Sequence, residues 1–333
     1  MRVATGETAA TEKRGPSDGA GSNPAMWASM RSLAYLLLLV TALSWAGNSI
    51  AGRFAAGSVS PEVLTTLRWT IAVAVMLPFA WRHLRNDWSV LRANWKRLAV
   101  LGACGFTIFN VLLYSSLERT TAINVVLVQA ALPALVFAFN YLVNGRQTVP
   151  LQIVGFTLSL AGVGLVVLGS GEGVASVGMG ELLALAAVVL YAGYTVALDD
   201  RPQAHWLGQL FVMGCAAWVV SLPFLAWDVL SGSANWPDDR AGIVVTIYAG
   251  VFPALIAQAC FIRGIALIGA NRAGLMVNLV PILGTLLAVV LLGEAFRWYH
   301  AAALILAMGG IALAEWAVAR RETEGAAVPE PAE

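Results

Sequence analysis

The stretch Ser44-Trp45-Ala46-Gly47-Asn48-Ser49-Ile50 returns in altered form as Leu190-Tyr191-Ala192-Gly193-Tyr194-Thr195-Val196. Both stretches lie inside long apolar segments. Downstream, Leu77-Pro78-Phe79-Ala80-Trp81 is matched by Leu222-Pro223-Phe224-Leu225-Ala226-Trp227. A nearly constant spacing then pairs Gly105 with Pro253, Asn110 with Gln258, Pro133 with Pro281 and Gly162 with Gly310. The sequence is therefore a duplication of one long apolar unit.

The composition is that of an integral membrane protein. The 333 residues are 59% hydrophobic and 12% charged, with a mean hydropathy of +0.75, whereas a soluble domain carries about 25% charged residues. The net charge is +1, so we expect no nucleic-acid partner. The three cysteines lie in apolar runs without CxxC spacing and the three histidines are far apart in sequence. We therefore expect no metal and no cofactor.

Ten segments have the length of about 20 residues that a helix needs to cross the hydrocarbon core. The predicted spans are 32–51, 63–81, 98–117, 122–143, 150–169, 179–198, 206–227, 242–262, 272–292 and 298–318. Five spans fall in each repeat, 29–170 and 178–319. The polar ends, 1–28 and 320–333, are expected to be disordered cytoplasmic tails.

The basic residues predict the orientation of the chain, because Lys and Arg concentrate on the cytoplasmic side. They cluster before span one, between spans two and three, and after span ten. Both termini are therefore expected in the cytoplasm. Five spans per repeat is an odd number, so the second repeat must be inverted in the bilayer. The sequence thus predicts an all-α membrane protein with ten transmembrane helices, arranged as two inverted five-helix repeats around a central cavity.

Several motifs resemble those of EamA-type members of the drug/metabolite transporter superfamily. They are Trp45-Ala46-Gly47-Asn48 in span one, Arg68 in span two, Pro133 in span four, and Leu291-Leu292-Gly293-Glu294 at the end of span nine. The resemblance implies a ten-helix basket whose cavity is lined mainly by spans one, three, four, six, eight and nine. It also implies a plasma-membrane exporter of amino acids, purines or other metabolites. One departure is visible, because Asn144-Gly145 stands in the first repeat where Glu294 stands in the second.

Polar and aromatic residues inside the spans are the candidates for substrate binding, because an unpartnered polar group in lipid is costly. The alternative is that they only join helices, a role in which each contributes about 0.6 kcal/mol. The matched pairs Asn48/Tyr194 and Asn110/Gln258 favour a pseudo-symmetric cavity. The candidates are Trp45, Asn48, Asn110, Tyr114, Gln129, Tyr191, Tyr194, Gln258 and Asn278.

Prolines and charged residues within or beside the spans have candidate roles in gating and binding. Pro133, Pro281 and Pro253 are either tolerated kinks or hinges. Arg68 either reaches the membrane interface or holds a carboxylate, from the substrate or from a neighbouring helix. Glu294 is a candidate for proton coupling, and structural pairing is the alternative. The glycine-rich spans five and ten are expected to pack closely, with a homodimer contact as one option.

These features favour a secondary transporter that exports a small polar metabolite, above all amino acids, by alternating access. Its partners would be the small-molecule substrate and the lipid bilayer. The uncharged, aromatic candidate residues suit an amphipathic zwitterion. Sugar phosphates would require Lys or Arg in the pocket, and both lysines, Lys13 and Lys96, lie outside the spans. Export of purines or drugs, a membrane sensor and an intramembrane enzyme remain alternatives. No metalloprotease or nucleophile–base motif supports the enzyme.

Overall fold

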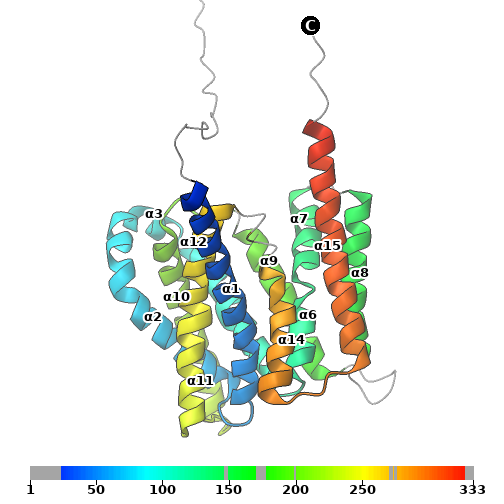
Figure 1. Cartoon of the computed structure of the whole chain (residues 1–333). Coiled ribbons are helices and arrows are strands. Elements are labelled where there is room, and N and C mark those ends of the chain that lie inside the picture. Colours follow the sequence, from blue (N-terminus) through cyan, green and yellow to red (C-terminus); the bar gives the residue numbers. More distant parts are fainter. Residues whose placement is uncertain are drawn as a thin grey trace, which may run out of the picture.

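A computed structural model of the chain describes residues 24–145, 149–169, 178–198, 200–269, 273 and 276–326. Within these residues the regular structure is entirely helical, and most of the helices run nearly parallel to one another (Figure 1). The helices are α1 (Pro24–Ala55), α2 (Pro61–Asn86), α3 (Trp88–Ala93), α4 (Trp95–Gly102), η1 (Ala103–Ile108), α5 (Phe109–Leu117), α6 (Ala122–Gln129), α7 (Leu132–Asn144), α8 (Pro150–Gly169), α9 (Met179–Ala197), α10 (Trp206–Leu230), α11 (Arg240–Val251), η2 (Phe252–Ile256), α12 (Ala257–Ile268), α14 (Leu279–Leu292) and α15 (Trp298–Ala326).

Nine helical segments of the described residues are long and apolar enough to cross a membrane, and the shorter apolar helix α14 belongs to the ninth predicted span. The first part of that span, from residue 272, lies largely outside the described residues. Two helices extend into the predicted tails, since α1 begins at Pro24 and α15 continues to Ala326. The rest of both tails, 1–23 and 327–333, lies outside the described residues. The protein is thus a ten-span, all-α membrane protein.

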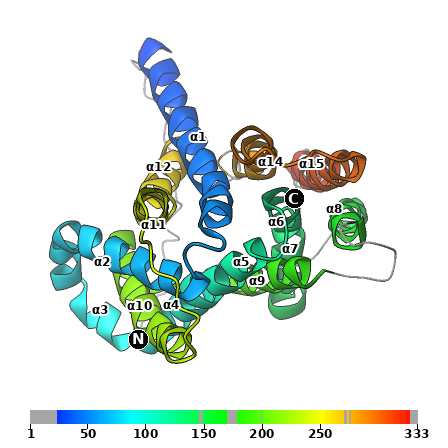
Figure 2. The same ribbon diagram turned by 90° about the horizontal axis from the view of Figure 1, so that it is seen from below.

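The helix contacts come in pairs that are related by exchanging the two repeats. Helix α1 packs against α11 and α12 of the second repeat, and α9 packs in the same way against η1 and α5 of the first. Likewise α1 contacts α14, and α9 contacts α6 and α7. Equivalent helices also pack against each other, namely α2 with α10 and α8 with α15, and the fourth and ninth spans meet where α6 contacts α14 (Figure 2). Such reciprocal pairing is the signature of a two-fold relation between the repeats.

Glycines bring α8 and α15 into close contact at one side of the bundle. A side chain at Gly155 would strike the carbonyl of Gly310, and a side chain at Gly162 would strike the carbonyl of Ala303. Gly162 and Gly310 are repeat equivalents, so the two contacts are again exchanged by the two-fold relation. Small residues allow this approach of two backbones. The expected close packing of spans five and ten is confirmed, and they pack against each other.

The hydrophobic core is distributed unequally along the membrane normal. We call the end where α1 begins and α15 finishes the termini end, and the opposite end the far end (Figure 1). One buried cluster occupies the far-end halves of helices from both repeats and includes Ile50, Leu64, Leu117, Ile123 and Val188. A second cluster lies toward the termini end, and its buried residues come mainly from α2, α3, α4 and α10. The far end is therefore packed across the whole bundle and the termini end on one side only.

Candidate functional site

Helix breaks at matched positions of the two repeats lie around the centre of the bundle. The π-helical turns η1 and η2 interrupt the third and eighth spans at equivalent places, near the matched pair Gly105 and Pro253. A second pair of breaks lies at Ala130–Ala131, between α6 and α7, and at the matched Asn278, just before α14. Local π-turns and interrupted helices in membrane proteins occur where backbone lines a cavity.

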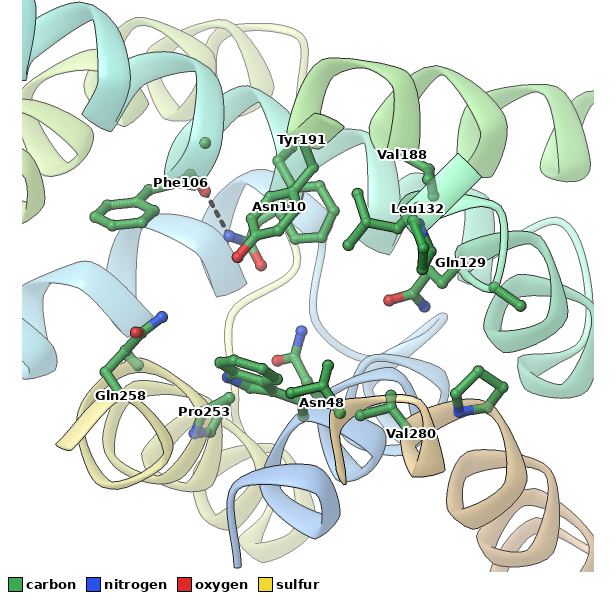
Figure 3. Close-up of a pocket in the computed structure, with 18 of the residues that line it drawn as sticks. Asn48, Phe106, Asn110, Gln129, Leu132, Val188, Tyr191, Pro253, Gln258 and Val280 are labelled. Atoms are coloured by element: carbon green, nitrogen blue, oxygen red, sulfur yellow. Dashed lines mark hydrogen bonds between the residues drawn. The ribbon is translucent and has the colours of Figure 1, made fainter. Parts of the chain in front are cut away.

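These breaks surround a cavity near the middle of the spans. It encloses about 1070 Å³ of empty space, including space open to solvent. Figure 3 shows Asn110 and Tyr191 on one side of the hollow, and Asn48, Pro253 and Gln258 on the other. Every span contributes to the wall except the fifth, among the described residues. The cavity thus lies between the repeats, where the duplication predicts it.

The structure places seven of the nine candidate binding residues in the cavity wall. They are Trp45, Asn48, Asn110, Gln129, Tyr191, Gln258 and Asn278. Tyr114 lies behind the wall and donates a hydrogen bond of 2.9 Å to Asn48 Oδ1. Tyr194 also lies behind it, where its ring packs against Gly105 and Phe106. These two tyrosines therefore support wall residues and do not themselves face the cavity.

Pro133, Pro281 and Pro253 also lie in the wall. Pro133 and Pro281 follow the two matched breaks by one turn, at the second or third position of the helix that resumes there. A proline fits this first turn because its missing amide would have no helical partner. Pro253 lies inside η2. The prolines thus coincide with real breaks in the helices, while a hinge motion at these sites stays a prediction.

Arg68 joins three helices beside the cavity. Its side chain is 5% exposed, and Nη1 donates to Asn48 Oδ1 at 3.1 Å, to Asn110 Oδ1 at 2.5 Å and to Tyr114 Oη at 2.7 Å. All three partners are neutral. The ion pairs of the described residues include Arg53–Glu294, Arg97–Asp200 and Arg119–Glu118, and none of these involves Arg68. No carboxylate of a described neighbouring helix therefore pairs with Arg68, and it does not snorkel to the membrane interface.

The second repeat has no counterpart of this arginine. In the register that matches Pro78 with Pro223, Met213 stands where Arg68 stands in the first repeat. Met213 is buried in the apolar cluster of the termini end. The cavity is therefore symmetric in its backbone breaks and asymmetric in its charge.

Glu294 lies away from the cavity, at the far end. Its carboxylate accepts hydrogen bonds from the backbone amides of Ala122 at 2.7 Å and Ile123 at 2.9 Å, the first residues of α6. Arg53 Nε lies 3.7 Å from the same carboxylate. Carboxylates are favoured at helix N-termini because the first amides lack helical partners. The geometry is thus that of the structural pairing which the sequence left open. Gly145 and Gly293 both end their helices with positive φ, so the residue matched to Glu294 is Arg146, outside the described residues.

A second polar network at the far end was not predicted from the sequence. Glu181 is 2% exposed and accepts hydrogen bonds from Thr120 and from Asn124 Nδ2, the latter at 2.8 Å. Asn124 Oδ1 lies 3.1 Å from His300 Nε2. The network joins the fourth, sixth and tenth spans. Because Glu181 and His300 lie within a few residues of predicted helix ends, hydropathy alone assigns them to the interface.

Three aromatic residues of the cavity wall, Trp69, Phe106 and Phe109, were also missed. Trp69 and Phe106 stack with their ring centroids 4.6 Å apart, and both line the cavity. In the sequence they are ordinary apolar residues of a span. The one signal that could have singled them out is that each is next in the chain to a residue already chosen, Arg68, Gly105 or Asn110.

Titratable groups outside the spans show two shifts. Burial and the neighbouring imidazole of His83 lower the pKa of His205 below its ordinary value, and Asp87 acts in the opposite direction. The His83 and His205 rings stack at 3.5 Å. At the far end, burial raises the pKa of Glu118, opposed by the charge of Arg119.

A duplicated ten-span bundle with a midplane cavity at broken helices is the architecture of a secondary transporter. The EamA-like transporter family model matches this chain twice, over residues 32–168 and 178–316. The chain therefore belongs to the EamA-like transporter family. The two matched segments agree with the two predicted repeats, and the protein is a multi-pass membrane transporter.

Curated relatives support this class without indicating a substrate. An uncharacterized transporter of Clostridium kluyveri is 23% identical over 278 residues, covering 79% of this chain and 86% of the relative. One of Archaeoglobus fulgidus is 26% identical over 293 residues, covering 85% and 98%. A crystal structure of another protein superposes with a TM-score of 0.61 at 25% identity, covering 87% of this chain and 99% of that chain. The fold is thus one already seen experimentally.

Proposed function

We propose that this protein exports a small amphipathic metabolite, with amino acids as the leading class, across the plasma membrane by alternating access. Its termini lie in the cytoplasm under this proposal. The observation that carries it is the midplane cavity, whose wall combines aromatic rings and amide side chains at matched helix breaks. Sites of this kind bind solutes through a few polar groups set in an apolar surface.

The packing of the bundle supports alternating access. The far end is closed by the apolar cluster of both repeats and by the bonds of Glu294 and Glu181. The termini end has a buried cluster on one side only. Inverted repeats can exchange their two packings, which would open the far end and close the termini end. The described arrangement is then the state that is closed toward the outside.

The chemistry of the wall favours an amphipathic solute over a polyanion. Trp45, Phe109 and Tyr191 offer apolar and aromatic surface, and Arg68 is the one charged residue among the described lining residues. A sugar phosphate would call for several basic groups. An ammonium group can be bound by backbone carbonyls, and Pro133 and Pro281 lack the amides that would otherwise bond to the carbonyls of Gln129 and Val277. Both of these residues line the cavity.

The test is transport by the purified full chain in lipid vesicles. Vesicles loaded with a mixture of unlabelled amino acids are diluted into each labelled amino acid in turn, and uptake by exchange is compared with protein-free vesicles. We expect exchange of at least one apolar or aromatic amino acid, recovered chemically unchanged. Recovery of an altered solute would instead indicate an enzyme. Saturable binding without flux would indicate a sensor, and either result would contradict the proposal.

A further inference from the structure

Hydrogen-bond donors without partners collect on one face of α2. The buried side-chain donors that lack a partner in the described part of the chain include Thr65 Oγ1, Arg68 Nε and Trp69 Nε1. Their side chains are 0%, 5% and 2% exposed. Positions i, i+3 and i+4 share one face of a helix, so the three groups lie together. Arg68 and Trp69 belong to the cavity wall.

The cost of leaving these donors unpaired is considerable. A buried polar atom without a hydrogen bond costs about 1–3 kcal/mol, and more when the group is charged. A guanidinium in the middle of a bilayer needs a partner of opposite charge or water. Arg68 also makes a cation–π contact, in which its Cζ lies 5.6 Å from the centroid of the Trp69 ring. A contact of that kind orients the cation without neutralising it.

The hydrogen bonds of the arginine leave one particular edge free. All three contacts from Arg68 use Nη1, whose two hydrogens are shared among the three acceptors, and they fix the plane of the guanidinium through Asn48, Asn110 and Tyr114. No hydrogen bond from Nε or Nη2 to the described residues is seen. Nε–H and Nη2–H point the same way and form the side edge of the group. A carboxylate binds to this edge through both of its oxygens.

We propose that this face of α2 is the receptor for a carboxylate of the transported solute. Arg68 binds the carboxylate through its side edge, and Trp69 Nε1 supplies an additional donor. Asn48, Asn110 and Tyr114 are positioning residues that hold the guanidinium. The inference rests on the proposed transport function and specifies its substrate class, a small monocarboxylate with an apolar body.

The asymmetry of the repeats defines how such a solute lies in the cavity. Its carboxylate contacts α2 of the first repeat, and its apolar body extends toward the wall of the second, where Tyr191, Leu210 and Ala254 lie. Met213 replaces the arginine there. A dicarboxylate would place its second charge against this apolar wall, so the site selects against it.

Binding to the purified full chain in detergent tests the inference. The probes are two series in which the carboxylate is kept or removed: L-phenylalanine, 3-phenylpropionate and L-phenylalaninamide, and L-leucine, 4-methylpentanoate and L-leucinamide. Ligand affinity is measured from the rise of the apparent melting temperature with concentration. We expect a carboxylate of at least one series to bind at least about 10-fold more tightly than its amide, the scale of one charged hydrogen bond. The 3-phenylpropionate and 4-methylpentanoate arms separate plain carboxylates from amino acids.

Three variants, with two matched controls, assign the preference to residues. Arg68→Gln should reduce the ratio of acid to amide affinity to about one, and Arg68→Lys should restore part of it. Trp69→Phe keeps the ring and removes the donor, so the ratio should fall by about 3- to 10-fold. The matched controls are Arg240→Gln and Trp227→Phe, because both residues are exposed. The controls should keep the wild-type ratio, and the wild-type comparison stands even where a variant fails to fold.

Equal affinity for acids and amides in the wild type would overturn the inference. So would an unchanged ratio in folded Arg68→Gln and Trp69→Phe proteins. If vesicles transport a solute without a carboxylate and neither series binds, the inference fails while the transport function stands. If no solute is transported by the vesicles, the proposed function fails and takes the inference with it.

Discussion

Replacing Glu294 with alanine should destabilise the protein through one identifiable helix end. The carboxylate bonds to the amides of Ala122 and Ile123, which are both 0% exposed. The Glu294 side chain itself is 9% exposed. Thr121 still accepts a hydrogen bond from the amide of Asn124 at 3.3 Å. The variant therefore leaves two buried amides at the start of α6 without their partner.

The expected loss follows from these contacts. Each unsatisfied buried amide costs about 1–3 kcal/mol, and loss of the negative charge at the helix N-terminus adds about 0.3–1 kcal/mol. Partial relaxation reduces the sum, so we expect about 2–5 kcal/mol for Glu294→Ala. Glu294→Gln keeps one acceptor oxygen and should lose about half as much. The neighbouring Arg53 contributes less, because its Nε lies 3.7 Å from the carboxylate and its side chain is 35% exposed.

Thermal unfolding of the purified protein in detergent measures the effect. A loss of this size corresponds to a fall in melting temperature on the order of 5–10 °C. Glu118→Ala is the matched control, since that glutamate lies at the same end of the bundle, its side chain is 31% exposed and its ion pair is with the adjacent Arg119. The reasoning is refuted if Glu294→Ala melts within about 1 °C of the wild type, or if Glu118→Ala loses as much.

Three further predictions concern the cavity, the helix crossing and pH. Trp45→Ala and Asn48→Ala should each lower the transport rate by about 10-fold or more at equal protein level, because the first removes a ring from the cavity wall and the second removes a hydrogen-bond acceptor of Arg68. Full transport by both variants would remove these residues from the site. Gly155→Ala should lower the melting temperature, because the new methyl group meets the backbone of α15. The control Gly164→Ala meets nothing within 4 Å and should be neutral or stabilising by up to about 1 kcal/mol. Equal effects of the two substitutions would contradict the close approach of α8 and α15. The lowered pKa of His205 means that this imidazole takes up a proton less readily in the folded protein than in the unfolded chain, so its contribution to stability is present above the unfolded pKa and is lost as the pH falls through the folded value. His83→Gln should therefore lessen the fall in melting temperature between neutral and mildly acidic pH. An unchanged pH profile would count against the stacked pair.

The architecture could be predicted from the sequence because hydrophobicity and duplication are both local signals. A span needs only length and apolar composition, and the odd number of spans per repeat requires inversion. Pro133 and Pro281 mark the breaks in the fourth and ninth spans, since proline is favoured in the first turn of a helix. Proline alone is not a sufficient signal, because Pro78 and Pro223 lie inside the unbroken helices α2 and α10. The π-turn near Gly105 has no such mark, and only its matched partner Pro253 indicates it.

The direction in which a side chain faces around its helix axis is harder to predict than its depth in the membrane, and the candidate site shows why. Hydropathy gives the depth of Tyr114 and Tyr194 in the membrane, and both are at cavity depth. Their placement behind the wall depends on which neighbour each helix packs against, and hence on contacts between residues far apart in sequence. Tyr194 lies behind Gly105 because the glycine lets the ring approach the backbone. The matched-pair argument therefore identifies the right helices and not always the right face.

The grouping around Arg68 shows a further limit of repeat symmetry as a guide. Symmetry pairs Asn48 with Tyr194 and Asn110 with Gln258, across the repeats. In the structure Asn48 and Asn110 instead converge on an arginine of their own repeat. A single cation recruits neutral acceptors from neighbouring helices, because in a medium of low dielectric constant each such bond is strong. The duplicated scaffold thus provides two equivalent half-sites. They differ because the first repeat has Arg68 at the position where the second has Met213. A carrier for an amphipathic solute requires that difference, since its two half-sites must contact opposite ends of the same molecule.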